Sequence, residues 1–185
     1  MMARNGLLAC ILLVVSATAR AVSNAPVGQG ADAYLQEIDR NGASTVLRNL
    51  RSDKTAWDKA IENISSGVRG WVDVAVALRT ASDAGSTSEL HSAMFLALSK
   101  NPSYVLQVVE LVDKPPYHSF LLSNVCEGRV DPPPTYQEAV AEFVRARAAI
   151  EKVQVAELQS KKKLCLTKLR EGERHLRRMF GVTGQ

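Results

Sequence analysis

The feature that most constrains the fold is a helical spacing of apolar residues that recurs along most of the chain. Apolar side chains at i, i+3, i+4 and i+7 lie on one face of an α-helix. Glycine, proline and asparagine interrupt this spacing at short intervals. Trp57 and Trp71 belong to two of the apolar faces and are expected to pack in a core. The pattern predicts an all-α fold in which short helical hairpins stack in a HEAT-like or irregular bundle.

The valine-rich segment Tyr104–Val112 is the one place where a strand competes with a helix. The helical spacing of its valines and an Asn-Pro pair before it favour a helix. The following segment, Leu111–Gly128, contains two adjacent prolines and is predicted to be irregular. One short helix is expected within it, at Phe120–Val125.

Two capping boxes predict where helices begin. In this motif a Ser or Thr and a Glu three residues later satisfy free N–H groups of the first helical turn. Ser86 with Glu89 predicts one helix start, and Thr135 with Glu138 predicts another. The second start begins a long helix, which is expected to pair with a last helix over about residues 155–180.

The first 21 residues have the parts of a secretory signal peptide: a basic start, a short apolar run and a small-x-small end. Arg4 precedes the apolar run Leu7–Val15, and cleavage is expected after Ala21 or, alternatively, after Ala19. The run is shorter than the roughly 20 apolar residues that cross a bilayer. A weak membrane anchor and a lipoprotein site at Cys10 are the less favoured interpretations.

The leader sets the expected domain organisation and compartment. We expect a signal peptide at 1–21, a flexible lead-in at 22–30, a single helical domain at 31–180 and a tail at 181–185. Export of this kind predicts a periplasmic location. The leader carries two of the positive charges behind the formal net charge of +4. The basic balance of the whole chain is therefore no argument for nucleic acid.

Two cysteines, Cys126 and Cys165, remain after the leader. An even cysteine count in an exported chain favours a disulfide. The bridge would pin the proline-rich bend at 132–134 to the apolar face of the last helix. Two buried free thiols are the alternative.

Candidate catalytic and metal-ligating residues are sparse. His91 is expected at the surface, in the first turn of a helix. Glu171 and His175, at i and i+4, supply only two ligands for a metal. His118 and Ser119 lack the G-x-S-x-G turn of a serine nucleophile. The sequence therefore predicts no catalytic residues, no metal site and no cofactor, and an enzyme with sparse catalytic residues is the least favoured class.

The most unusual feature is the basic end of the chain. Its eight cations are Lys161, Lys162, Lys163, Lys168, Arg170, Arg174, Arg177 and Arg178. A solvated helix face is the simplest interpretation. The functional interpretation is a patch for an acidic protein partner or for anionic lipid at a membrane surface. Export and the near absence of aromatic residues in this segment argue against nucleic acid.

Several stretches together resemble known proteins. They are "WDKAIENISSG", "WVDVAVALRTASDAGSTSELHSAMFLALSKNP", "NVCEG", "YQEAV" and "CLTKLR". With the leader, they resemble a group of uncharacterised exported helical proteins of Gram-negative bacteria, over about Trp57 to Arg170. The resemblance implies a periplasmic helical domain with Cys126 and Cys165 bridged, and it implies no activity. The basic extension after Arg170 is longer than that pattern needs.

A second resemblance is one of type, without a diagnostic motif. The chain is similar to the small, helical, disulfide-stapled immunity proteins that block cell-wall-degrading toxins of type VI secretion systems. We therefore expect a non-enzymatic periplasmic protein-binding module, with an immunity or inhibitor protein against a cell-envelope toxin as its most concrete form. The alternative is an envelope-associated structural or assembly factor whose basic C-terminal helix lies at an anionic membrane surface.

Overall fold

The computed structural model describes residues 30–111 and 120–182 of the 185-residue chain. Within these ranges all regular secondary structure is helical, as the spacing of apolar residues predicted. The expected signal peptide and nearly all of the lead-in lie outside the described residues, and so do His118 and Ser119.

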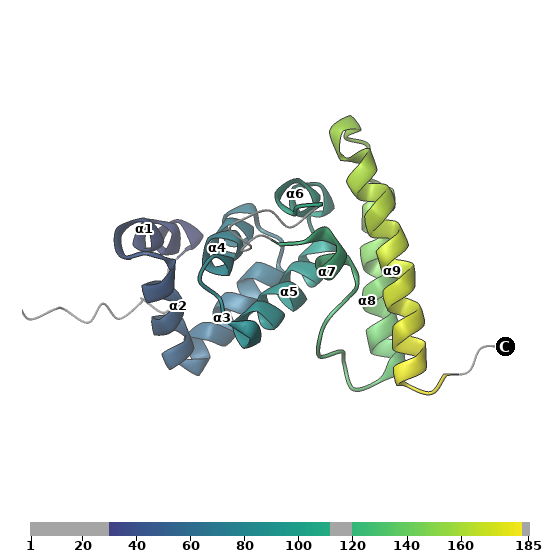
Figure 1. Cartoon of the computed structure of the whole chain (residues 1–185), viewed down its shortest axis with the longest axis horizontal. Coiled ribbons are helices and arrows are strands. Elements are labelled where there is room, and N and C mark those ends of the chain that lie inside the picture. The colour runs from purple at the N-terminus through teal and green to yellow at the C-terminus, as the bar shows by residue number, and fades with distance from the viewer. Residues whose placement is uncertain (1–29, 112–119, 183–185) are drawn as a thin grey trace, which may run out of the picture.

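The helices fall into an N-terminal array and a long C-terminal pair (Figure 1). The array begins with α1 (Ala31–Asn41), α2 (Ala43–Ser52), α3 (Lys54–Ser65), α4 (Arg69–Arg79) and α5 (Ala84–Leu98). The short helices α6 (Pro102–Val108) and α7 (Leu122–Cys126) follow. The pair consists of α8 (Tyr136–Glu151) and α9 (Gln159–Met179), joined through a 3-10 turn, η1 (Ala156–Leu158). The last predicted helix, at about 155–180, is thus divided into η1 and α9.

Successive helices of the array pack as hairpins. Helix α1 contacts both α2 and α4, and α3 packs along α5. The pair α8 and α9 lies side by side at the end of the molecule opposite α1 (Figure 1). This arrangement is the stack of short helical hairpins with a long C-terminal pair that the sequence predicted.

One hydrophobic cluster joins the array to the pair. The rings of Phe95 in α5 and Phe143 in α8 lie 5.0 Å apart and link the two parts. Trp57 is buried in the core, as predicted. Trp71 is only partly buried, and its ring packs 5.3 Å from that of Tyr34 in α1.

The structure confirms one predicted helix start and corrects the other. The Thr135 hydroxyl oxygen accepts the Glu138 N–H at 3.3 Å, so Thr135 caps α8. Ser86 does not cap α5, because the helix begins earlier with Asp83 as its cap. The Asp83 carboxylate accepts both the N–H and the hydroxyl of Ser86, at 2.8 and 2.6 Å. The prediction was wrong because Asp is as good a cap as Ser, and Asp83 stands three residues upstream.

The valine-rich segment is a helix, as expected, but a shorter one. Helix α6 ends at Val108, and Val109 takes an extended conformation with ψ at 146°. The Glu110 N–H then donates to the Phe120 carbonyl at 2.7 Å, and the Leu122 N–H donates to the Glu110 carbonyl at 2.8 Å. These two bonds form an isolated bridge before α7, which begins two residues later than predicted.

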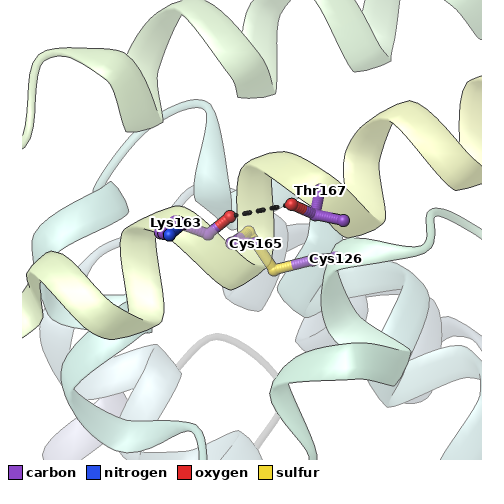
Figure 2. The surroundings of a disulfide bond; sticks show 4 residues. All are labelled: Cys126, Lys163, Cys165 and Thr167. Carbon is purple, nitrogen blue, oxygen red and sulfur yellow. Dashed lines mark hydrogen bonds between the residues drawn. A yellow bond between two sulfur atoms is a disulfide. The ribbon is translucent and has the colours of Figure 1, made fainter.

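Helix α9 is fixed against α7 at neighbouring points. Cys126 at the end of α7 and Cys165 in α9 form a disulfide with both residues fully buried, as the cysteine count predicted (Figure 2). Two turns further along α9, a Cβ atom at Gly172 would lie 2.1 Å from the carbonyl oxygen of Glu127. Only glycine allows the backbone of α9 to approach so closely. The position of the last helix is therefore set by a covalent bond and by a glycine contact.

Candidate functional site

The basic residues of α9 surround a buried apolar face. Cys165, Leu169, Gly172 and Leu176 are buried against the rest of the protein. Because each residue turns the helix by about 100°, the opposite face points away from the core. The structure separates the eight predicted basic residues into four that bind within the chain and four that do not.

Lys161 binds the end of α6. Its Nζ donates to the carbonyl oxygens of Gln107 at 3.2 Å and Val109 at 2.5 Å. The last carbonyls of a helix have no partner inside the helix and attract a positive charge. Lys161 is therefore a structural cap between α9 and α6.

Lys162 makes the corresponding contact with α8. Its Nζ donates to the carbonyl oxygens of Glu151 at 2.7 Å and Val153 at 2.8 Å. These carbonyls lie at the C-terminal end of α8, where a cation is favoured. Sequence reasoning missed both lysine caps, because their acceptors are backbone atoms of other helices.

Lys168 lies in an ion-pair cluster beside the disulfide. Its Nζ is 2.8 Å from Glu171 in α9 and 3.1 Å from Glu127, which follows α7. The hydrogen bond with Glu171 raises the pKa of Lys168 most, and the hydrogen bond with Glu127 raises it further. The same contact with Lys168 lowers the pKa of the Glu171 carboxyl. This cluster joins α9 to the end of α7.

Arg177 belongs to a bridge between α8 and α9. Its guanidinium lies 3.3 Å from Glu173, and the same carboxylate lies 3.1 Å from Arg147 of α8. The Glu173 side chain is only 16% exposed, so it is held between two cations. Arg177 is thus partly neutralised by a contact that stabilises the helix pair.

The other four cations form a surface that we call the basic stripe. It consists of Lys163, Arg170, Arg174 and Arg178, all of them exposed. Their positions at i, i+7, i+11 and i+15 place them on one helix face, over about 22 Å. Their side chains make no hydrogen bond or ion pair with the described part of the chain. The surface is hollowed beside Arg170 and Arg174, in a depression of about 340 Å³.

In the described ranges no three His, Cys, Asp or Glu side chains are grouped so that they could hold a metal ion. The prediction that His91 is a surface residue is wrong, because this residue of α5 is only 9% exposed and its ring lies 5.2 Å from that of Phe120. Burial and the nearby positive charge of Arg79 lower the pKa of His91 to about 4. His175 is exposed on α9, while the carboxylate of Glu171 binds Lys168.

We expect buried His91 to make the protein sensitive to acid. The unfolded chain binds a proton at His91 near pH 6.5, whereas the folded protein binds it only near pH 4. Stability is therefore lost as the pH falls below 6.5, by about 2 kcal/mol at about pH 5 relative to neutral pH. Urea unfolding at these pH values measures the loss. The variant His91→Leu should lose clearly less stability over the same range, and an equal loss would contradict this assignment.

In residues 30–111 and 120–182 no helix is both long enough and apolar enough to span a bilayer. Comparison of the chain with protein-family models, with curated proteins and with solved structures finds no match.

Proposed function

We propose that this protein is a non-enzymatic binding module that receives an acidic surface of a protein partner on its basic stripe. One observation carries the proposal. Four of the eight cations of this segment bind within the chain, while Lys163, Arg170, Arg174 and Arg178 remain together on one exposed face. A row of exposed positive charges attracts an oppositely charged surface and speeds its association.

The way in which α9 is held supports recognition by a preformed surface. The disulfide, the close contact at Gly172 and the Lys168 ion pairs all act on the side of α9 that faces the protein. The stripe is therefore in place before a partner arrives. A preformed surface loses little conformational entropy on binding, which favours affinity.

The amphipathicity of α9 favours a protein partner over a lipid surface. A helix that lies in a membrane interface buries a free apolar face among the lipids. In α9 that face is already buried against the core, with Cys165 bonded to Cys126. The stripe itself contains only cations, so contact with anionic lipid would be electrostatic alone. An envelope-associated factor that uses this helix at a membrane is the second candidate and is tested below.

The leader-like first 21 residues and the disulfide support a periplasmic location within this proposal. There the partner is an envelope protein with an acidic surface. An inhibitor or immunity protein against a cell-envelope toxin is the most concrete form. Such an inhibitor requires a stable scaffold and one binding face, and it requires no catalytic group.

A capture experiment with matched variants tests the proposal. The stripe variant carries Lys163→Gln, Arg170→Gln, Arg174→Gln and Arg178→Gln. The control variant carries the same charge change at four other exposed cations, Arg48→Gln, Lys100→Gln, Arg145→Gln and Lys152→Gln. Each immobilised protein is exposed to envelope extract of the source cells at low salt, and bound proteins are identified by mass spectrometry.

We expect one stoichiometric acidic partner on the wild type and the control variant, and its loss from the stripe variant. Vesicles with and without anionic lipid form a second arm. A second outcome is that no protein partner is captured, while anionic vesicles bind the wild type and not the stripe variant. That result would favour the envelope-associated factor that acts at a membrane surface. Equal capture by the stripe and control variants would refute a role for the stripe.

A further inference from the structure

The basic stripe is not uniform along α9. Its middle part is hollowed by the depression of about 340 Å³, which is lined by Thr167, Arg170, Glu173, Arg174 and Arg177. Lys163 and Arg178, at the two ends of the stripe, do not line it. A concave surface can surround a group of a partner, whereas a cation on a convex surface can only face it. The stripe therefore contains a candidate for a discrete binding site.

One lining residue, Arg177, is held in place by a carboxylate that also binds α8. Its guanidinium lies 3.3 Å from Glu173, and the same carboxylate lies 3.1 Å from Arg147 of α8. The negative charge of Glu173 is thus shared between two guanidinium groups. A guanidinium has five N–H donors, so those of Arg177 that Glu173 does not use stay available to a ligand. The lining keeps a positive balance, with three arginines against one paired carboxylate.

The other two arginines of the lining, Arg170 and Arg174, are exposed and four residues apart. Side chains at this spacing are neighbours on a helix surface. Each guanidinium is planar and presents N–H groups in a fork that matches the two oxygens of a carboxylate. The ammonium group of Lys163 is a point charge without that match. Arg170 and Arg174 are therefore suited to hold one carboxylate between them.

The chemistry of the lining favours a carboxylate over a more highly charged anion. An acidic protein surface presents its negative charge as the carboxylates of Asp and Glu. A phosphate group also fits a guanidinium. The Glu173 carboxylate lines the same depression, however, and it repels a doubly charged group more strongly than a singly charged one.

We infer that this depression receives the side-chain carboxylate of one Glu or Asp of the protein partner. Arg170 and Arg174 form the anchoring pair, and Arg177 supplies further N–H donors. Lys163 and Arg178 attract the partner through their charge but do not hold the anchoring side chain. The inference rests on the proposed function, and within the stripe it names the residues that decide which group of the partner is recognised.

Substitutions that keep the charge test this assignment. Arg170→Lys and Arg174→Lys replace a guanidinium of the depression by an ammonium group, and Arg178→Lys makes the same change one helical turn beyond it. The probe is the capped peptide acetyl-Gly-Glu-Gly-amide, compared with peptides that carry glutamine or phosphoserine at the central position. Binding to the labelled full chain is followed at low salt through the Nε–H resonances of its arginines.

We expect the glutamate peptide to give saturable shifts at Arg170 and Arg174. Arg170→Lys or Arg174→Lys should weaken its binding about fivefold, and Arg178→Lys should change it by less than about twofold. The glutamine peptide should bind at least about tenfold more weakly, and the phosphoserine peptide no more tightly. The inference is overturned if the glutamate peptide gives no saturable shift, if the glutamine peptide binds as well, if the phosphoserine peptide binds more tightly, or if Arg178→Lys has as large an effect as the other two.

The same variants, measured with the captured partner, separate this inference from the proposed function. We expect Arg170→Lys and Arg174→Lys to weaken the complex about fivefold relative to Arg178→Lys. If the stripe variant with four glutamines binds as its control does, the proposed function fails. If that variant loses the partner while the three Arg→Lys variants bind it equally well, the stripe acts through charge alone, and only the anchoring inference fails.

Discussion

Removal of the disulfide by Cys126→Ala and Cys165→Ala is expected to lower the free energy of unfolding by about 4 kcal/mol. The two cysteines are 39 residues apart, and their bond restricts the unfolded chain by closing that loop. Both residues are fully buried, so the alanines also leave the contact between α7 and α9 less well packed. Urea unfolding of the double variant and the wild type measures the difference.

The control for this prediction is the wild type unfolded with and without a reducing agent. A reduced wild type should lose about as much stability as the double variant. A loss of less than about 1 kcal/mol in both would show that packing alone holds α9, contrary to the role assigned to the bridge.

The second large effect is expected from Gly172→Ala. The added Cβ would lie 2.1 Å from the carbonyl oxygen of Glu127 and 2.8 Å from the ring of Phe143. A backbone oxygen cannot turn aside as a flexible side chain does, so α9 or the segment after α7 must shift. Overpacking of this kind costs about 3 kcal/mol, well above the small gain from replacing glycine with alanine inside a helix. Thermal or urea unfolding measures it.

Gly85→Ala is the matched control, because Gly85 lies in α5 and its added Cβ would lie 3.7 Å from the nearest neighbouring atom. That substitution should be neutral or slightly stabilising. If Gly172→Ala were as well tolerated as Gly85→Ala, the close approach of α9 to the end of α7 would be disproved.

The all-α fold could be predicted from the sequence, because it follows from local patterns of apolar and capping residues. Apolar spacing at i, i+3, i+4 and i+7 reports which face of each helix is buried, and Thr135 reports where α8 begins. The pairing of Cys126 with Cys165 required only the cysteine count and the expected export. The predicted helix starts at Ser86 and Phe120 were wrong. Asp83 caps α5 in place of Ser86. The backbone carbonyl of Phe120 accepts a hydrogen bond from Glu110, so Phe120 belongs to the bridge before α7.

The candidate site could be predicted from the sequence only in part. The sequence places eight cations in one segment, but their roles depend on which atoms of other helices lie nearby. Lys161 and Lys162 bind carbonyls that are 52 and 9 residues away, at Val109 and Val153. The same limit explains the error at His91, because its burial depends on Phe120 and on the segment after α7.

We propose above that the outer face of α9 is the contact surface for an acidic partner. The most direct test is the dissociation constant of the complex with the captured partner, measured over a series of salt concentrations. We compare the wild type, the stripe variant and the control variant of equal charge. If the stripe forms the contact, salt weakens the complex, and at low salt the stripe variant binds at least about tenfold more weakly than the control. Equal, salt-insensitive affinities for all three proteins would contradict it.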